Sequence, residues 1–183
     1  MDNGASSYRR YLNGDESAFH DIVKEYFDSL VFFVDRYVRD PAAAEDIAID
    51  AFTQLVVHKH RYNFQVSLKT YLFMIGRSRA LDYIRHRNKF PTVKLSEAGT
   101  MASDEPSLEE LILADERKRA VNAALAQLGD DMRVAVHLVY FEELTCEEAA
   151  RVMRKSRKQV YNLLYRAKNA LRTILGQEGE LLL

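Results

Sequence analysis

The chain has few of the features on which disulfide-rich, membrane-spanning and strand-rich proteins depend. Its single cysteine, Cys146, excludes an internal disulfide framework and fits a reducing compartment. No run of about 18 apolar residues occurs and the N-terminus has no apolar segment, so we expect no membrane span, no signal peptide and a cytoplasmic protein. Seven Gly, three Pro and the lack of long strand-like alternation predict an all-α fold.

Groups suited to catalysis or metal binding are also sparse. His58 and His60 form a His-x-His pair, but the sequence offers no third clustered ligand. Glu45 and Asp46 are adjacent and point to different sides of a helix, so they cannot converge as an acid–base pair. There is no glycine-rich phosphate loop and no nucleophile elbow. We therefore expect no metal, no cofactor, no small-molecule substrate and no enzymatic activity.

The formal net charge of -1 conceals an uneven distribution of charge. Residues 1–94 carry 14 basic and 12 acidic groups, residues 95–115 carry 6 acidic and no basic groups, and residues 116–183 carry 12 basic and 9 acidic groups. The basic groups are clustered, and the acidic segment cancels them in the total. The charge of the whole chain is therefore compatible with binding to nucleic acid.

The stretch from Thr145 to Arg172 has the pattern of two short helices joined by a tight turn. Thr145 and Glu148 form a capping-box sequence, which predicts that a helix begins near Cys146. Ser156 is a suitable N-cap for the second helix. Helical spacing predicts the buried side of that second helix, which consists of Val160, Leu163, Leu164, Ala167, Leu171 and Ile174.

The opposite face of this second helix has the composition of a DNA-binding surface. From Arg151 to Arg172 there are eight Lys or Arg and no Asp or Glu. Such side chains can neutralise phosphates and donate to base edges in a major groove, although a solvated basic helix is the alternative. The predicted DNA-contacting residues are Ser156, Arg157, Lys158, Gln159, Tyr161, Asn162, Tyr165 and Arg166.

Three long helices are predicted in the N-terminal half, over residues 16–38, 41–57 and 68–88. Each is preceded by a residue that can cap its first turn. These caps are Asp15, Asp40 and Ser67.

The helix over residues 41–57 carries a polar ridge beside its apolar stripe. A solvated helix face and a partner surface explain such a ridge equally well on sequence alone. We call this set the acidic ridge, and it consists of Glu45, Asp46, Asp50 and Gln54.

The next segment is basic and aromatic. Residues 59–94 contain nine Lys or Arg against one acid, Asp82. Basic groups can follow a nucleic-acid backbone, and aromatic rings can stack on unpaired bases. About half of the aromatic residues are expected to lie in the core instead. They are Tyr62, Phe64, Tyr71, Phe73, Tyr83 and Phe90.

Residues 91–106 lack helical periodicity and are predicted to form a flexible acidic linker. The linker divides the chain into two small helical domains, residues 1–90 and residues 107–183. The second domain is predicted to begin with a helix over residues 107–128 that ends at Gly129, followed by a helix that Asp130 caps.

Two parts of the chain resemble the extracytoplasmic-function type of sigma factor, the dissociable promoter-recognition subunit of bacterial RNA polymerase. AEDIAIDAFTQLVVHKHRY at residues 44–62 and SLKTYLFMIGRSRALDYIRHRNK at residues 67–89 look like sigma domain 2. LGDDMRVAVHLVYFEELTCEEAARVMRKSRKQVYNLLYRAKNAL at residues 128–171 looks like sigma domain 4. Both parts occur in the order expected of that family, separated by a short linker.

The resemblance implies a role for each surface. It implies that the acidic ridge docks on the clamp helices of the largest polymerase subunit, with the flap as a second contact, and that an anti-sigma factor is a possible partner. The second helix of the C-terminal pair would read the minus-35 element of promoter DNA. The melted minus-10 strand would be held by Arg61, Tyr62, Asn63, Phe64, Lys69, Arg77, Ser78, Arg79, Arg85 and Arg87.

Several positions depart from the family pattern. Arg154-Lys155 stands in the turn where the family usually has Gly followed by an aliphatic residue. The other departures are Ile49 for Gln, Val56 and Tyr71 for Trp, Ser78 for Asn and Leu163 for Arg.

Two other classes of protein remain open at this point. A stand-alone helix-turn-helix regulator would explain the C-terminal half, but it has no need for an acidic ridge followed by a basic aromatic helix. A polymerase-bound inhibitor would explain the ridge, but it has no need for an acid-free helix face.

Overall fold

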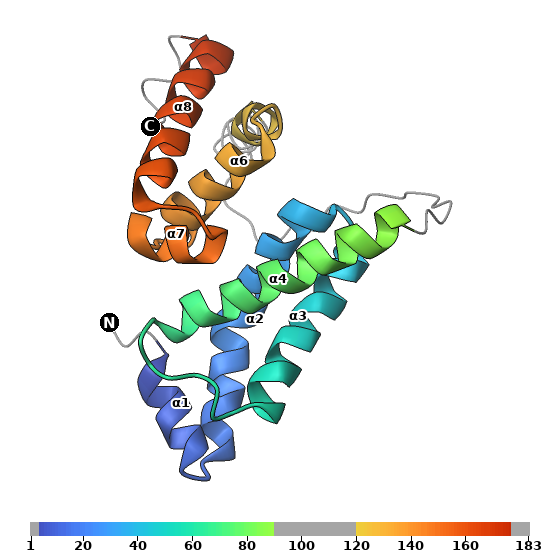
Figure 1. The fold of residues 1–183 in the computed structure, drawn as a ribbon, viewed down its shortest axis with the longest axis vertical. Coiled ribbons are helices and arrows are strands. Elements are labelled where there is room, and N and C mark those ends of the chain that lie inside the picture. The colour runs from blue at the N-terminus through green and yellow to red at the C-terminus, as the bar shows by residue number, and fades with distance from the viewer. Residues whose placement is uncertain (1–3, 90–119, 177–183) are drawn as a thin grey trace, which may run out of the picture.

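The computed structural model describes residues 4–89 and 120–176, in which every regular element is a helix. The helices form two bundles, one above the other in Figure 1. We call residues 4–89 the N-terminal bundle and residues 120–176 the C-terminal bundle. The prediction of an all-α protein with two small helical domains is confirmed; the linker at residues 91–106 and the first part of the helix predicted over residues 107–128 lie outside the described residues.

The N-terminal bundle consists of α1 (Ala5–Leu12), α2 (Glu16–Val38), α3 (Pro41–Val57) and α4 (Leu68–Lys89). The three long helices begin where their caps predicted, and α4 ends one residue later than expected. In Figure 1, α4 crosses in front of α2 and α3. The long helices pack on one another through fully buried apolar side chains that include Ile22, Leu30, Phe33, Ala48, Leu68 and Leu72.

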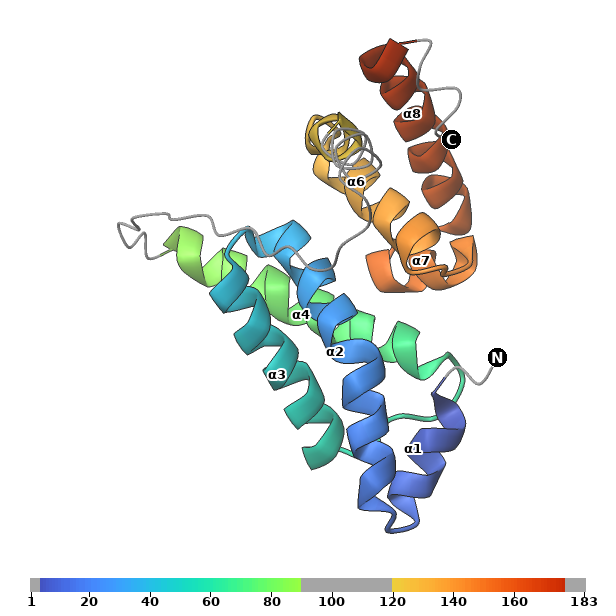
Figure 2. The ribbon, with the colours of Figure 1, turned by 180° about the vertical axis from the view of Figure 1, so that it is seen from behind.

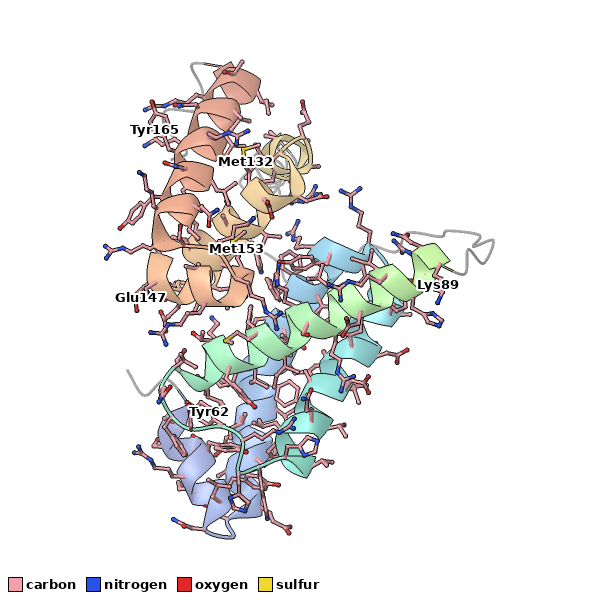
Figure 3. The ribbon with its side chains drawn as sticks, viewed as in Figure 1. Tyr62, Lys89, Met132, Glu147, Met153 and Tyr165 are labelled. Carbon is pink, nitrogen blue, oxygen red and sulfur yellow. The ribbon has the colours of Figure 1, made fainter. Side chains whose placement is uncertain are left out.

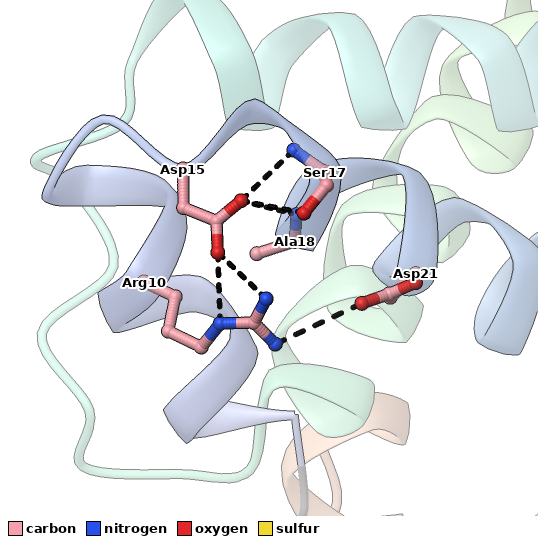
Figure 4. A network of polar contacts seen from close by, with 5 residues as sticks. All are labelled: Arg10, Asp15, Ser17, Ala18 and Asp21. Atoms are coloured by element: carbon pink, nitrogen blue, oxygen red, sulfur yellow. Dashed lines mark hydrogen bonds and ion pairs between the residues drawn. The ribbon is translucent and has the colours of Figure 1, made fainter.

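Asp15 shows how local sequence begins α2 (Figure 4). Its Oδ1 accepts hydrogen bonds from the backbone N–H of Ser17 at 3.1 Å and of Ala18 at 3.4 Å. Its Oδ2 accepts from Nη2 of Arg10 at 2.6 Å, which joins the end of α1 to the start of α2. The hydroxyl of Ser17 also donates to Oδ1 at 2.6 Å, and this bond together with the one from Arg10 lowers the pKa of Asp15 below its ordinary value. The carboxylate thus accepts from two backbone N–H groups that have no partner within the helix, and its negative charge interacts favourably with the helix dipole.

Helix α1 was not predicted from the sequence. It has eight residues and its N-cap, Gly4, makes no side-chain hydrogen bond, so no capping pattern marks its start. A tertiary contact holds it in place instead. Tyr8 is fully buried, and its hydroxyl lies within hydrogen-bond distance of the backbone oxygens of Leu55 at 3.2 Å and Lys59 at 2.8 Å.

The crossing of α2 and α4 depends on a glycine. A Cβ atom at Gly76 would lie 2.8 Å from Cδ1 of Leu30 and 3.2 Å from Cγ2 of Val34. A Cβ atom does not tolerate an approach as close as the first, so Gly76 allows the two helices to pack closely at this point.

The C-terminal bundle contains a helical segment at residues 120–126, then α6 (Asp130–Val136), a π-helical turn η1 (His137–Phe141), α7 (Cys146–Met153) and α8 (Arg157–Leu175). The predicted cap of α6 was wrong by one residue, because Gly129 occupies the N-cap position and Asp130 is the first helical residue. The C-terminal end of the helix predicted over residues 107–128 packs as expected. Its buried residues Ala124, Leu125 and Leu128 form a small core with Val136, Ala167 and Leu171.

The π-helical turn was also not predicted. Its backbone N–H at Glu142 donates to the oxygen of His137 at 3.0 Å, a bond between residues five apart. Such a turn is rare and often marks a functional site. It ends at Phe141, and Glu143, two residues further on, adopts the left-handed conformation with φ 55.

The described residues offer neither a membrane-spanning helix nor a metal-binding cluster. None of the described helices combines the length and apolar character needed to cross a membrane. No group of three or more His, Cys, Asp or Glu residues at positions 4–89 or 120–176 could hold a metal ion.

Candidate nucleic-acid interface

Helices α7 and α8 form the predicted pair, and each begins with a reciprocal capping box. At α7 the Thr145 hydroxyl accepts from the N–H of Glu148 at 3.2 Å, and the Glu148 carboxylate accepts from the N–H of Thr145 at 3.0 Å. At α8 Ser156 and Gln159 make the equivalent bonds at 3.2 Å and 2.7 Å. Both caps confirm the predicted helix starts.

The capping role changes the interpretation of Gln159. We predicted that its amide would be part of the DNA-reading surface. In the structure its Oε1 accepts the hydrogen bond from the N–H of Ser156, so this oxygen is already occupied. Ser156 and Gln159 are three residues apart, as are Thr145 and Glu148. The sequence therefore contains the signal for this second capping box as well, although only the first was predicted.

The turn between α7 and α8 contains a residue in the left-handed conformation, and this residue is not a glycine. Arg154 has φ 52 and ψ 45, and its N–H lies 3.3 Å from the oxygen of Arg151. The N–H of Lys155 donates to the oxygen of Ala150 at 3.0 Å, which closes the turn in the manner of a helix C-cap. Nζ of Lys155 lies 2.9 Å from the carboxylate of Asp131 on α6. The unusual Arg154-Lys155 pair therefore preserves the turn, but with a strained backbone at Arg154.

The two faces of α8 separate as the sequence predicted. Val160 and Ala167 are fully buried and Leu171 nearly so, whereas Ile174 at the end of the stripe is 37% exposed. The opposite face projects away from both bundles, and Figure 3 shows Tyr165 pointing outward from α8. We call this opposite face the reading face, and its exposed residues are Arg157, Lys158, Tyr161, Asn162, Tyr165 and Arg166.

Aromatic and basic groups on the reading face support one another. The guanidinium of Arg157 lies 5.4 Å from the ring centroid of Tyr161, and its Nη2 donates to the Tyr161 hydroxyl at 3.3 Å. This hydrogen bond raises the pKa of Arg157, so its positive charge is retained. Tyr161 and Tyr165 are 50% and 70% exposed, so their rings are available to a partner.

In the N-terminal bundle, the loop before α4 offers fewer aromatic groups than we predicted. Tyr62 is 3% exposed, and its ring packs 5.4 Å from that of Tyr8 while its hydroxyl donates to the oxygen of Val66 at 2.6 Å. The prediction that Tyr62 presents its ring to an unpaired base does not fit this burial; the residue instead holds the loop in place. Phe64 is half-buried, with the guanidinium of Arg9 at 4.9 Å from its ring centroid.

The remaining loop and α4 residues divide between solvent and internal contacts. Arg61, Asn63, Arg79 and Arg85 are exposed. The half-buried members of the predicted set are Lys69, Arg77, Ser78 and Arg87, of which Arg87 donates to the oxygen of Val38 at 3.0 Å and Arg77 lies beside the hydroxyl of Tyr37.

The acidic ridge lies on the outer side of α3. Glu45, Asp46 and Asp50 are exposed, and Gln54 is half-buried and accepts a hydrogen bond from Nη2 of Arg79 at 3.4 Å. Next to the ridge is a shallow apolar groove between α2 and α3, which the sequence analysis missed. Ile49 and Val56, which are 49% and 38% exposed, line it together with Phe19, Val23, Phe27, Phe52 and Thr53. The signal in the sequence was the apolar residue at position 49 within an otherwise polar helix face.

Two family models match the chain over these surfaces. Sigma-70 region 2 matches residues 22–90, and Sigma-70, region 4 matches residues 118–171, so that together they span more than half of the sequence. The ECF RNA polymerase sigma factor SigM of Bacillus subtilis is 25% identical over 157 residues, which cover 86% of this chain and 94% of that protein. The RNA polymerase sigma-H factor of Pseudomonas aeruginosa is 27% identical over 170 residues, 88% of each protein.

The chain belongs to the extracytoplasmic-function sigma factors. Two solved structures have the same fold. Sigma factor RpoE of Bartonella quintana, solved with the anti-sigma factor NepR, has a TM-score of 0.67 at 22% identity over 87% of this chain and 97% of its own. CnrH, solved with the cytosolic domain of CnrY, has a TM-score of 0.63 at 19% identity over 94% of each chain. A stand-alone regulator is not favoured, because such a protein does not require region 2.

Proposed function

We propose that this sigma factor binds core RNA polymerase through the acidic ridge and the adjacent groove, and recognises a two-part promoter. The reading face of α8 enters the major groove of the minus-35 element. The loop before α4 and the exposed arginines of α4 hold the minus-10 strand. The protein directs initiation by binding and does not itself catalyse a reaction.

The observation that carries this proposal is the reading face. A capped helix of 19 residues, Arg157–Leu175, is anchored by Val160 and Ala167 and presents an acid-free polar surface to solvent. The N-terminal residues of such a recognition helix contact base edges, and the basic groups around them contact phosphates. Lys158 and Asn162 lie one turn apart on this face, so both can reach neighbouring base pairs.

The N-terminal bundle would supply the energy for opening the promoter. An unstacked base loses a few kcal/mol, which must be recovered by contacts with the protein. Because Tyr62 is buried, we assign the stacking contact to Phe64, whose ring is half-exposed beside Arg9. Arg61 of the loop and Arg79 of α4 are exposed and are suited to phosphate contacts.

Binding to polymerase is proposed to use charge and apolar area together. The three carboxylates of the acidic ridge would steer the ridge toward basic groups on the largest-subunit clamp helices. The exposed side chains of Ile49 and Val56 would then be buried, which supplies affinity that is insensitive to salt. The polymerase flap would hold the C-terminal bundle. An anti-sigma factor is proposed as a competing partner, since RpoE of Bartonella quintana, which has the same fold, was solved in complex with the anti-sigma factor NepR.

Reconstitution tests the proposal as a whole. Purified protein is added to core polymerase and a library of promoter sequences, and transcripts are sequenced. We expect initiation from a defined pair of elements and none when either element is scrambled. Absence of initiation from every sequence in the library would contradict the proposed function.

A charge reversal tests the polymerase contact separately. Asp46→Lys with Asp50→Lys should weaken the complex with core polymerase at least tenfold, because two attractive interfacial charges become repulsive. Glu25→Lys with Asp28→Lys is the matched control, since both residues are exposed and acidic and lie on α2 outside the ridge. Equal binding by the ridge variant and the control would exclude the acidic ridge as the docking surface.

A further inference from the structure

The two bundles are joined by a continuous apolar interface. Leu138, Leu144 and Ala149 of the C-terminal bundle are buried in the same core cluster as Leu68 and Phe73 of the N-terminal bundle. Helices α4 and α7 contact one another, and α7 lies beside the N-terminal part of α4 in Figures 1 and 2. We call this the closed arrangement.

A buried carboxylate lies at the centre of the interface. Glu142 is 6% exposed, and Nζ of Lys69 lies 2.8 Å from its Oε2 while also donating to its backbone oxygen at 2.9 Å. Nε2 of His137 lies 3.2 Å from Oε1 of Glu142. The π-helical turn makes this possible, because its five-residue hydrogen bond brings His137 and Glu142 onto one side of the chain.

A second carboxylate joins the bundles at the start of α4. Oε1 of Glu148 accepts hydrogen bonds from the hydroxyls of Ser67 and Thr70, each at 3.2 Å. The other oxygen, Oε2, accepts the N–H of Thr145 and so caps α7. One side chain therefore connects the N-termini of α7 and α4, next to the loop that we assign to the minus-10 strand.

The closed arrangement is too short to contact both promoter elements. Positions minus-35 and minus-10 are separated by roughly 25 base pairs, or about 85 Å of straight duplex at 3.4 Å per base pair. A compact chain of 183 residues has a radius of gyration of roughly 16 Å and a diameter of roughly 40 Å. The bundles must separate before both elements are bound, and the contact between Glu142 and Lys69 must then break.

We propose that Glu142 of the C-terminal bundle holds the free protein closed by occupying Lys69, so that Glu142 and promoter DNA compete for the same ammonium group. This inference rests on the proposed function and extends its minus-10 surface to Lys69, which the family resemblance places there and which lies at the start of α4 beside the loop. The free protein is thereby kept from binding DNA through its N-terminal bundle until polymerase separates the bundles.

Burial distinguishes this contact from the other ion pair between the bundles. Arg39 and Asp130 are 3.1 Å apart, but their side chains are 67% and 78% exposed, so solvent and salt screen the pair. Lys69 and Glu142 are 24% and 6% exposed, and the loss of one partner leaves a charge buried without compensation. Although burial raises the pKa of Glu142, the neighbouring His137 and Lys69 lower it further, so the carboxylate is charged.

The test compares Glu142→Gln with Glu143→Gln in the full chain. Both variants remove one negative charge, but Glu143 is exposed and precedes the next helix without contacting Lys69 in any described bond. Small-angle X-ray scattering measures the radius of gyration, and fluorescence anisotropy measures binding of a labelled single-stranded oligonucleotide of random sequence. We expect Glu142→Gln to expand the chain and to bind the oligonucleotide about tenfold more tightly, since the competent fraction rises. Glu143→Gln should match the wild type in both measurements.

Lys69→Met tests separately whether the pair closes the protein and whether DNA competes for Lys69. It also covers the case in which Glu142→Gln does not fold, which circular dichroism would reveal. It should also expand the chain, but without a gain in affinity, because the group that DNA needs has been removed. Unchanged dimensions in folded Glu142→Gln or folded Lys69→Met would overturn the closing role of the pair. Expansion of Lys69→Met with the full gain in affinity would instead overturn the competition for Lys69, and it would leave polymerase docking, tested by the ridge variants, unaffected.

Discussion

Replacing Arg154 by glycine should stabilise this sigma factor. Arg154 has φ 52 and ψ 45, a left-handed conformation in which an L-residue is disfavoured by roughly 1–2 kcal/mol because Cβ approaches the following carbonyl oxygen. Glycine has no Cβ and removes this strain. The side chain of Arg154 is exposed and takes part in no ion pair with a described residue, so its removal sacrifices no described ion-pair contact.

The increase in the free energy of unfolding is partly offset by the effect of glycine on the unfolded state. A glycine makes the unfolded chain more flexible, which costs roughly 0.4–1 kcal/mol. The difference between the mid-values of the two effects is a net stabilisation of about 0.8 kcal/mol. For a chain of 183 residues, this corresponds to an increase in Tm of roughly 1–4 °C.

Urea unfolding of the full chain measures the effect, with the stability read from the midpoint at constant slope. Arg166→Gly is the matched control, because Arg166 is an exposed arginine in the middle of α8 that takes part in no described ion pair, and its backbone is helical. It should destabilise the protein by about 1 kcal/mol, since glycine is unfavourable inside a helix. A midpoint for Arg154→Gly at or below that of the wild type would refute the assignment of strain to Arg154.

Three further predictions follow from other parts of the structure. Gly76→Ala should destabilise the protein by about 1–3 kcal/mol in the same unfolding assay, because its Cβ would lie 2.8 Å from Leu30. Lys158→Ala or Asn162→Ala should relax promoter specificity at one or two base pairs in a binding selection, whereas Arg172→Ala should weaken all sequences alike. The stabilising effect of Glu142 is present above pH 4.5, its ordinary pKa, and should be lost as the pH falls through the lowered folded value. Glu142→Gln should therefore reduce the loss of stability measured by acid titration below that pH.

Local patterns predicted the helices that begin with a cap. Asp15, Asp40, Ser67, Thr145 and Ser156 each accept the backbone hydrogen bond that their position in the sequence indicated. A cap depends on residues two or three positions away, so the sequence contains all the information that it needs. The same reason explains why apolar stripes correctly located the buried face of α8.

The elements that were missed depend on contacts between distant residues. Helix α1 is fixed by Tyr8, whose partners lie on and just after α3, 47 and 51 residues away. The π-helical turn places His137 and Glu142 against Lys69, which lies in the other bundle. No local sequence pattern indicates either arrangement. Each is stabilised by a buried polar group whose hydrogen-bond partner is distant in the sequence and comes close only when the helices pack.

The sequence indicates the chemistry of a candidate site residue but not whether its side chain is available to a partner. Tyr62, Gln159 and Lys69 have the chemistry that nucleic-acid binding requires, yet the structure gives each of them another partner. For Tyr62 and Gln159 the partner is local and belongs to the fold. For Lys69 the partner comes from the other bundle and can be released. A sequence pattern does not distinguish these cases, since they differ in burial and in the cost of breaking the contact.

The contacts that close the protein need not be strong. Covalent connection of the two bundles through residues 90–119 gives them an effective concentration on the order of millimolar. An interface with a dissociation constant near 0.1 mM, or about 5.5 kcal/mol, then keeps about nine-tenths of the molecules closed, which is the fraction that a tenfold gain in DNA affinity requires. The buried pair at Glu142, the two hydroxyl contacts at Glu148 and the apolar contacts around Leu138 and Leu144 together are of this order once the cost of burying the charges is included. Binding of polymerase and promoter DNA to both bundles, as proposed above, would therefore open the protein without outside energy.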